Sequence, residues 1–394
     1  MTDQPSEGPD AAGVPLATVA REWTRIGVTG FGGPPAHVLL LRRLVVDRRR
    51  WMDAQEFEDA NAACGLLPGP ASTQLAIFCA YRVGGPLAAV VGGLGFVLPA
   101  VVLVLALSAL FFGHAPPLWV RGAGAGAGAA VAAVVVQAGR SLLVPSYLRV
   151  RDDRARTLRW AGYLAAAAAA ATFAGPYLVL VLLASGLIEL AVQLRGTVAA
   201  GMHPGLLAAL APGAVATGGL GALCWTAFKV GALSYGGGFV IIPLMQSDAV
   251  HAYHWMTAAE FANAVALGQI TPGPVVATIA AVGYAAHGVV GGLLAAAVAF
   301  VPSFSFILLG GGRFQRLRSS ARARAFLEGA GPAAIGAILG AAVPLAVALD
   351  EAWQVALLAV AAVALLVLRR GVVETLLCAG AVGVVVALAG GPLP

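Results

Sequence analysis

The sequence predicts an all-α polytopic membrane protein built from two inverted-topology repeats, each with about five spanning helices plus a re-entrant Pro-Gly-Pro hairpin. Three observations support this prediction. Hydrophobic residues make up 60% of the 394 residues and charged residues only 11%, with a mean hydropathy of +0.88. Soluble domains carry about 25% charged residues, so this chain cannot cover a water-exposed surface. In addition, the sequence matches itself at a fixed offset, and arginine-rich loops alternate between the two copies.

The chain shows no leader, metal or cofactor motif. Residues 1–15 are polar and rich in proline and glycine, so we expect a disordered tail rather than a signal peptide. The four cysteines are scattered through apolar segments without CxxC or CxxH spacing, so we expect neither a metal nor a cofactor. The net charge of +6 comes from arginines in short loops, a pattern typical of membrane topology and not of nucleic-acid binding.

The internal repeat rests on matched glycine and proline breaks within apolar stretches. Motifs of the first half recur in the second in nearly one register, which chance does not produce. We therefore predict repeats at 16–195 and 220–394, joined by a linker at 196–219. The matched motifs are RIGVTGFGGPP (25–35) with KVGALSYGGGF (229–239), WMDAQEFEDA (51–60) with WMTAAEFANA (255–264), LPGP (67–70) with TPGP (271–274), and WVRGAGAGAG (119–128) with FLEGAGPAAI (326–335).

Each repeat holds six apolar elements. The first is interrupted by a glycine-rich cluster and the second by Pro-Gly-Pro, whereas the other four are long apolar runs typical of spanning helices. In chain order the elements lie at 18–41, 56–82, 84–112, 117–145, 157–174 and 176–194, and then at 222–245, 257–286, 288–312, 325–348, 353–369 and 371–390.

Equivalent loops of the two repeats carry opposite charge patterns. The loop after the first element holds Arg42, Arg43, Arg48, Arg49 and Arg50, whereas its counterpart at 246–256 holds no arginine. The loop after the third element is arginine-rich only in the second repeat, at 313–324. The loop after the fourth is arginine-rich only in the first, at 149–159. The positive-inside rule then places the repeats in opposite orientations, which is the plan of many secondary transporters.

Inversion requires an odd number of crossings in each repeat, and six elements give an even number. Because Pro-Gly-Pro interrupts the second element, we predict that 56–82 and 257–286 turn at the midplane and leave on the side they entered. About ten helices would then span the membrane, with the arginine-rich loops and 369–370 cytoplasmic and both termini outside. An extra helix within 196–219 would change this count.

The helix breaks give a physical basis for an anion site. A half-helix that starts at the midplane presents unpaired backbone N–H groups and the positive end of its dipole, to which anions bind. Proline at its first position costs nothing. We expect such starts after all four breaks, directed at one midplane site. The candidate substrate-binding residues at the breaks are Gly32, Gly33, Pro34, His37, Pro68, Gly69, Pro70, Ala71, Ser72, Thr73, Gln74, Gly236, Gly237, Pro272, Gly273, Pro274 and Thr278.

Two cations and two acids at matched positions extend the candidate site. Lys229, the only lysine, aligns with Arg25, and both precede a glycine-rich break. We predict that they bind the anion; alternatively, each anchors its helix at the membrane interface. Glu56 and Glu260 could couple or gate transport, although stabilising a helix start is the simpler role. His37 could carry a proton or lie solvated at the interface.

These motifs resemble one known family. FGGPPAH (31–37), the run WMDAQEFEDANAACGLLPGPASTQLA (51–76) and a weaker second copy with YGGGFVIIPL and TPGPVV are similar to the chromate ion transporter (CHR) family in its long two-domain form. The resemblance covers most of residues 20–310. It implies oppositely oriented homologous domains and export of chromate from the cytoplasm, which gives chromate resistance. YGGG replaces FGGP at 235–238, so the two halves need not contact substrate equally.

The residues themselves indicate an anion transporter, and chromate is implied by the resemblance alone. We expect a multi-pass protein of the cell inner (plasma) membrane, driven by membrane potential, proton coupling or both. A sulfate or other oxyanion transporter or exchanger and an anion channel are the alternatives. No HExxH, GxSxG or P-loop motif occurs, so we do not expect an enzyme. Membrane lipid is the other expected partner, and glycine-rich faces such as GAGAGAGAA (122–130) could pack helices within one chain or in a homodimer.

Overall fold

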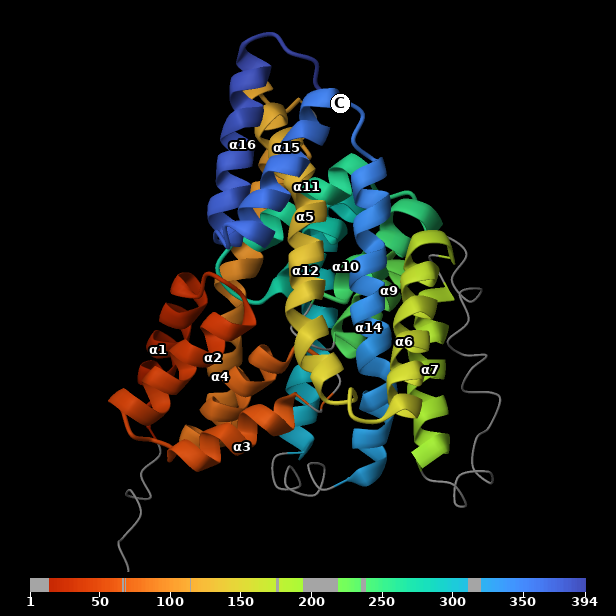
Figure 1. Cartoon of the computed structure of the whole chain (residues 1–394). Helices are drawn as coiled ribbons and strands as arrows, with labels where there is room; N and C mark the ends of the chain where they lie inside the picture. The colour runs from red at the N-terminus through yellow and green to blue at the C-terminus, as the bar shows by residue number, and fades with distance from the viewer. Residues whose placement is uncertain are drawn as a thin grey trace, which may run out of the picture.

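The computed structural model describes residues 14–65, 67, 69–113, 115–174, 177–193, 219–234, 239–310 and 320–394. Within these ranges the all-helical prediction is confirmed, with fourteen α-helices (Figure 1). Four of the described helices are long and apolar enough to cross a membrane, namely α4 (Ala71–Phe111), α5 (Leu118–Leu148), the helix at Val275–Gly310 and α14 (Ala321–Val347). The expected tail, apart from its last two residues, and all of the linker but Gly219 lie outside the described residues.

The elements alternate with breaks at the positions that the glycine and proline motifs predicted. Those before the linker are α1 (Leu16–Thr29), α2 (Pro34–Arg42), η1 (Arg43–Arg48), α3 (Ala54–Cys64), α4, α5, α6 (Arg154–Ala169), η2 (Ala170–Ala174) and α7 (Leu178–Gln193). Those after it are α9 (Leu220–Leu233), α10 (Ile241–Gln246), η5 (Ser247–Ala252), α11 (Ala258–Ile270), η6 (Val275–Thr278), α12 (Ile279–Gly310), α14, α15 (Ala352–Ala362), η7 (Val363–Val367) and α16 (Val372–Leu388).

The first apolar element, expected at 18–41, is not one spanning helix. α1 ends before Gly32 and Gly33, whose φ angles of 101° and 71° suit glycine, and α2 begins at Pro34. Beyond α2 the chain returns along α1, because Arg48 and Arg49 pair with Glu22 at 2.5 and 2.7 Å. This stretch is therefore two short helices that fold back on each other and not one continuous helix.

The start of α1 lies at the same end of the molecule as the first arginine-rich loop. The backbone N–H of Val14 donates to the carbonyl of Val83 at 3.4 Å. Arg82, the residue before Val83, pairs with Glu56 at the start of α3. Arg42 pairs with Glu58 of the same helix at 3.4 Å. Residue 14 therefore lies at the same end of the molecule as the start of α3 and Arg42.

Both long broken helices fold back on themselves at a glycine. α4 bends at Gly84 and Gly85, so that a Cβ on Gly92 would lie 2.6 Å from the Cβ of Ala80. α12 bends at His287 and Gly288, and there Gly291 packs against Gly283 in the same way. In each case the segment after the Pro-Gly-Pro turn runs antiparallel to the longer segment that follows the bend.

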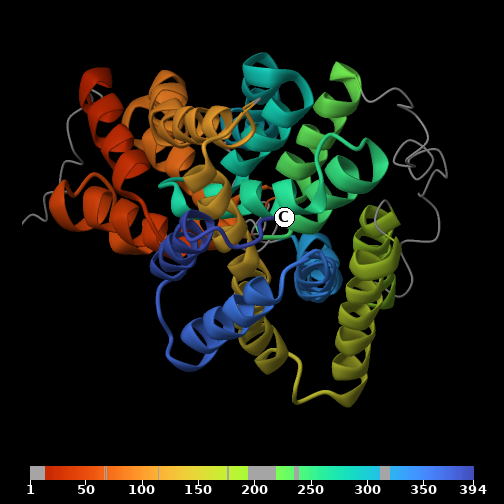
Figure 2. The same cartoon turned by 90° about the horizontal axis from the view of Figure 1, so that it is seen from above.

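The last two helices of each half pack on a long helix that belongs to the other half of the chain. α5 packs most extensively against α16 and also against α15, whereas α14 packs against α6 and α7. Figures 1 and 2 show these two groups on different sides of the molecule. Glycines allow the close approach: a Cβ on Gly126 would lie 2.2 Å from the carbonyl oxygen of Ala379, and one on Gly336 would lie 2.0 Å from that of Leu164.

Candidate functional site

Helix starts from different breaks meet in the centre of the fold. His37, in the first turn of α2, lies 3.3 Å from the hydroxyl of Ser72 in the first turn of α4. Its Nε2–H donates to the carbonyl of Gly30 at 3.0 Å, so Nδ1 of the neutral ring accepts from Ser72. The ring is fully buried and stands edge-on to Phe96 at 5.0 Å. The alternative of a solvated interfacial histidine is therefore wrong, because the buried His37 joins two helix starts.

Each Pro-Gly-Pro turn contacts the C-terminal end of the helix (α1 or α9) that precedes a glycine-rich motif on the other side of the linker. The N–H of Gly273 donates to the carbonyl of Gly30 at 3.1 Å. Reciprocally, a Cβ on Gly69 would lie 3.2 Å from the carbonyl oxygen of Gly231 and 3.3 Å from the hydroxyl of Ser303. Positive φ angles of 117° at Gly69 and 105° at Gly273 make both turns specific for glycine. The two turns therefore lie in one continuous central region.

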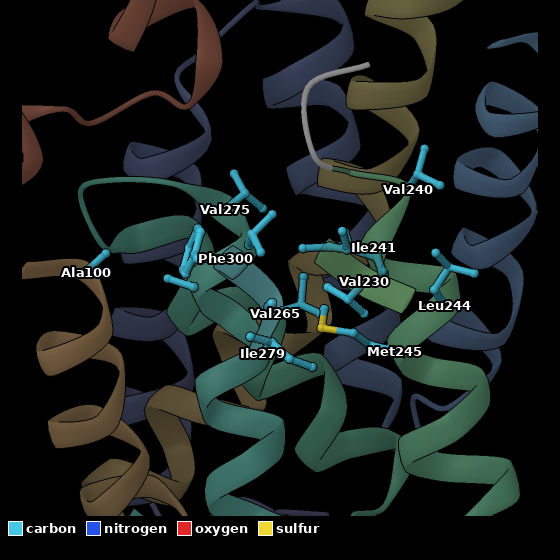
Figure 3. Packing of buried hydrophobic residues seen from close by; sticks show 14 of the residues in the cluster. Ala100, Val230, Val240, Ile241, Leu244, Met245, Val265, Val275, Ile279 and Phe300 are labelled. Atoms are coloured by element: carbon cyan, nitrogen blue, oxygen red, sulfur yellow. The ribbon is translucent and has the colours of Figure 1, made fainter. Parts of the chain in front are cut away.

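The two turns differ in polarity. After the first turn, α4 begins with Ala71 followed by the buried polar residues Ser72, Thr73 and Gln74. After the second, η6 begins with Val275, Val276 and Ala277, which belong to an apolar cluster (Figure 3). Ala100 of α4 faces Gly273, in contrast to the serine beside Gly69. The polar part of the region is therefore the first turn.

Two buried hydroxyl groups near the first turn have no hydrogen-bond partner among the described residues. They belong to Thr73, in the first turn of α4, and Ser303, beside Gly69. Both side chains are fully buried. An unsatisfied buried hydroxyl costs about 1–3 kcal/mol, so such groups indicate a missing ligand or water. The sequence analysis missed Ser303 because its aligned residue in the first half is Ala100 and the repeat gives no signal for it.

Lys229 is held by a buried carboxylate that the sequence analysis also missed. Its ammonium lies 2.5 Å from Asp248 of η5, which accepts a second bond from Thr226 at 2.6 Å. Burial raises the pKa of Tyr253, in the loop beyond η5, and the negative charge of Asp248 raises it further. Lys229 precedes Gly231, whose carbonyl oxygen faces Gly69 of the first Pro-Gly-Pro turn, by two residues on the same helix.

The other matched charges have roles at helix ends and surfaces. Arg25 is exposed on α1 and forms no ion pair with any described residue, which favours the interfacial alternative. Glu56 pairs with Arg82, and Glu260 closes a capping box with Thr257. Both acids therefore have the simpler structural contacts, and a coupling role stays a prediction.

The remaining predicted residues divide between helix starts and undescribed positions. Pro34 opens α2, and Pro70 and Pro274 immediately precede α4 and η6. Thr278 donates to the carbonyl of Val275 at 2.7 Å. Pro272 precedes Gly273 in the second turn. Pro68, Gly236 and Gly237 lie outside the described residues.

Comparisons with known proteins identify similar chains over nearly the full length. The sequence profile described as "Chromate transporter" matches residues 17–190 and 221–386. The chain is 32% identical over 376 residues to a chromate transport protein of Cupriavidus metallidurans, covering 93% of this chain and 91% of the relative. It is 30% identical to a chromate transport protein of Pseudomonas aeruginosa, covering 82% and 79%. No solved structure matches.

Proposed function

This chain belongs to the chromate transporter family, and from that premise we propose that it exports chromate from the cytoplasm as a secondary transporter working by alternating access. As a member of that family it is a multi-pass membrane protein and a transporter, not an enzyme. The cell inner membrane is the proposed location. The membrane potential favours outward movement of an anion by about 2.3 kcal/mol per charge per 100 mV, so potential, proton coupling or both can drive export.

The proposed transporter consists of two homologous halves in opposite orientation. The two parts of the family match begin 204 residues apart, at 17 and 221. α1 and α9 have the same spacing at both ends, as do η1 and η5. The arginine-rich loops swap between the halves. In this arrangement the hairpins α1–α2 and α3–α4 and their equivalents in the second half are re-entrant. The number of membrane crossings also depends on the linker, which lies outside the described residues except for Gly219.

The chromate site that we propose lies at the first Pro-Gly-Pro turn. The observation that carries it is the pair of unsatisfied buried hydroxyls of Ser303, beside Gly69, and Thr73, in the first turn of the helix that follows the turn. Chromate is a compact tetrahedral dianion whose oxygens only accept hydrogen bonds. Hydroxyl donors and the N–H groups at the start of α4 suit it, and Lys229 supplies the nearby positive charge. The apolar second turn completes the scaffold.

Everted vesicles that contain the protein are expected to accumulate labelled chromate above the level of empty vesicles, because export becomes uptake when the membrane is inverted. Uptake should rise when the potential is set positive inside the vesicle. The Arg25→Ala variant should transport like the parent, since Arg25 is exposed. Accumulation no higher than in empty vesicles would refute chromate export. A strong loss of chromate uptake in Arg25→Ala would indicate that Arg25 binds the substrate after all.

Thr73→Val and Ser303→Ala are each expected to lower chromate transport at least about tenfold without lowering the melting temperature. A hydrogen bond to a charged group contributes about 1.5–3 kcal/mol, whereas removing an unsatisfied hydroxyl relieves a cost. Ser108→Ala is the matched control, because the Ser108 hydroxyl is also buried on α4 without a partner among the described residues. Equal transport in all three variants would contradict the proposed site.

Transport of sulfate or another oxyanion is the second candidate function. Sulfate is also a tetrahedral dianion, and the donors around Gly69 do not distinguish it from chromate by charge. Sulfate that competes for chromate uptake and accumulates faster would favour this function. A flux that increases linearly with driving force and does not saturate would instead indicate an anion channel.

A further inference from the structure

The two halves differ in how one face of each long helix is covered. This face carries Gly124 and Gly128 on α5, whereas the aligned positions on α14 are Gly331 and the buried Ile335. On α5, a Cβ on Gly124 would lie 2.9 Å from Nδ2 of Asn263, and one on Gly128 would lie 2.7 Å from its Oδ1. Asn263 belongs to α11, so α11 covers this face. On α14, no described atom lies within 4 Å of a Cβ built on Gly331.

Glycine contacts fix the correspondence between the two faces. A Cβ on Gly122 would meet the carbonyl oxygen of Gly383 at 2.5 Å and the Cβ of Ala387 at 2.6 Å. A Cβ on Gly329 would meet the carbonyl oxygen of Ser185 at 2.1 Å and the Cβ of Glu189 at 2.8 Å. Gly122 therefore corresponds to Gly329, and two residues further on Gly124 corresponds to Gly331. The sequence repeat aligns Asn263 with Asp59 of α3.

The helices that carry Asn263 and Asp59 are packed differently. α11 packs against α5, α14 and α16, and most of its length from Phe261 to Gly268 is buried. α3 packs mainly against α2 and α4, and only Phe57, Ala60, Ala63 and Cys64 are buried. Figure 1 shows α3 at the lower end of the molecule, apart from α14. α11 is therefore more deeply buried among its neighbours than α3 is.

We propose that the face of α14 around Gly331 is a docking surface for α3 in a second conformation, with Asp59 lying on Gly331 as Asn263 lies on Gly124. Docking of α3 and release of α11 exchange the helix that packs on a long helix of the fold, and alternating access needs such an exchange between equivalent elements. The proposal rests on the inverted two-half organisation proposed above.

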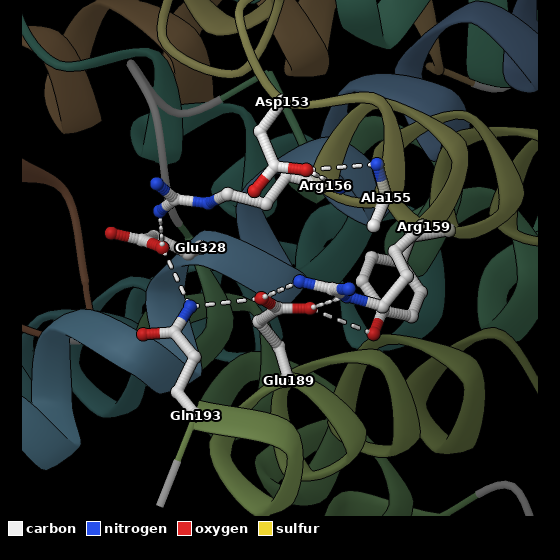
Figure 4. Close-up of polar contacts among 8 residues, drawn as sticks. Asp153, Ala155, Arg156, Arg159, Glu189, Gln193 and Glu328 are labelled. Atoms are coloured by element: carbon white, nitrogen blue, oxygen red, sulfur yellow. Dashed lines mark hydrogen bonds and ion pairs between the residues drawn. The ribbon is translucent and has the colours of Figure 1, made fainter.

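Charge complementarity supports this occupant. Glu328, three residues before Gly331, pairs with Arg156 of α6 at 2.6 Å and accepts from Gln193 of α7 at 2.7 Å (Figure 4). All three side chains are at least partly exposed. α3 is acidic along this stretch, and the start of α14 carries basic residues. These are Glu56, Glu58 and Asp59 on α3, and Arg322 and Arg324 on α14. Docking therefore requires Glu56 and Glu58 to exchange their present partners, Arg82 and Arg42, for the arginines of α14.

Paired cysteines test the docking in the full-length protein after the four native cysteines are replaced and chromate transport of that parent is verified. Asp59→Cys with Gly331→Cys is expected to form a disulfide under copper phenanthroline, because docking would bring the two Cα atoms within the roughly 4–7 Å that a disulfide spans. The bond should stop transport by at least about tenfold, and reduction should restore it. Asn263→Cys with Gly124→Cys should also cross-link, trapping the conformation described here.

The pairs distinguish docking from random motion. Chromate or a reversed potential should change the two cross-linking yields in opposite directions. Asp59→Cys with Ala348→Cys, at the far end of α14, should not cross-link. Failure of the Asp59–Gly331 pair while the Asn263–Gly124 pair forms would overturn the docking but leave chromate transport by the parent intact. Equal cross-linking of the Ala348 pair would also overturn it.

Discussion

Replacing Asp248 with alanine is expected to destabilise the protein by about 3–5 kcal/mol and to abolish chromate transport, because it leaves a buried ammonium without its partner. The Asp248 and Lys229 side chains are only 6% and 13% exposed and lie 2.5 Å apart. Lys229→Ala should be similarly destabilising, since it leaves the carboxylate with Thr226 alone. Thermal melting in detergent measures the first effect, and vesicle uptake measures the second.

The double variant Lys229→Met with Asp248→Leu separates structure from transport. Replacing both members of a buried ion pair by apolar residues of similar size is often neutral for stability. We therefore expect the double variant to melt near the parent temperature but to transport little chromate, since the site loses its positive charge. Full transport by the double variant would remove Lys229 from the proposed site. A melting temperature as low as that of Asp248→Ala would show that an unpaired buried charge is not the cause of the destabilisation.

The helix breaks could be predicted from the sequence because their causes are local. Proline lacks a backbone donor and glycine permits a positive φ, so the helix starts at Ala71 and Val275 follow directly from the motifs. Hydropathy, however, does not tell a broken span from a hairpin. The fold-back of α2 along α1 is visible only in the contacts of Glu22 with Arg48 and Arg49, which are far apart in sequence.

The candidate site was predicted only where the two halves resemble each other. Ser72 and Thr73 follow a repeated turn and were identified. Ser303 and Asp248 align with Ala100 and Leu44, so a comparison of the halves gives no signal for either. Function in a duplicated protein can reside where the copies have diverged, and only the three-dimensional arrangement places Ser303 beside Gly69.

The glycine run at 122–130 had two predicted uses, within one chain or between protomers. In the structure Gly122 and Gly126 contact α16 of the same chain, which accounts for this part of the run without a second copy. Gly124 and Gly128 contact Asn263 of α11. A homodimer stays a prediction that other surfaces would have to support.

Replacing Gly126 with leucine is therefore expected to abolish stable folding, and no change at the partner helix should rescue it. A Cβ there would lie 2.2 Å from the carbonyl oxygen of Ala379 and 2.9 Å from the backbone of Gly383, so α5 and α16 would have to separate. Overpacking costs about 1–3 kcal/mol even where side chains can move, and backbone atoms cannot move aside. Ala379→Gly leaves the clashing oxygen in place and should not restore the melting temperature.

Gly162→Leu on α6 is the matched control, because no described atom lies within 4 Å of a Cβ at that exposed position. There leucine should be tolerated or slightly stabilising, since it favours a helix over glycine by about 1 kcal/mol. Thermal melting and size-exclusion profiles in detergent compare the two variants. If Gly126→Leu has the same melting temperature as the parent, the close contact between α5 and α16 is absent in the membrane. The packing of α15 and α16 on α5, a helix of the other half, would then have to be abandoned.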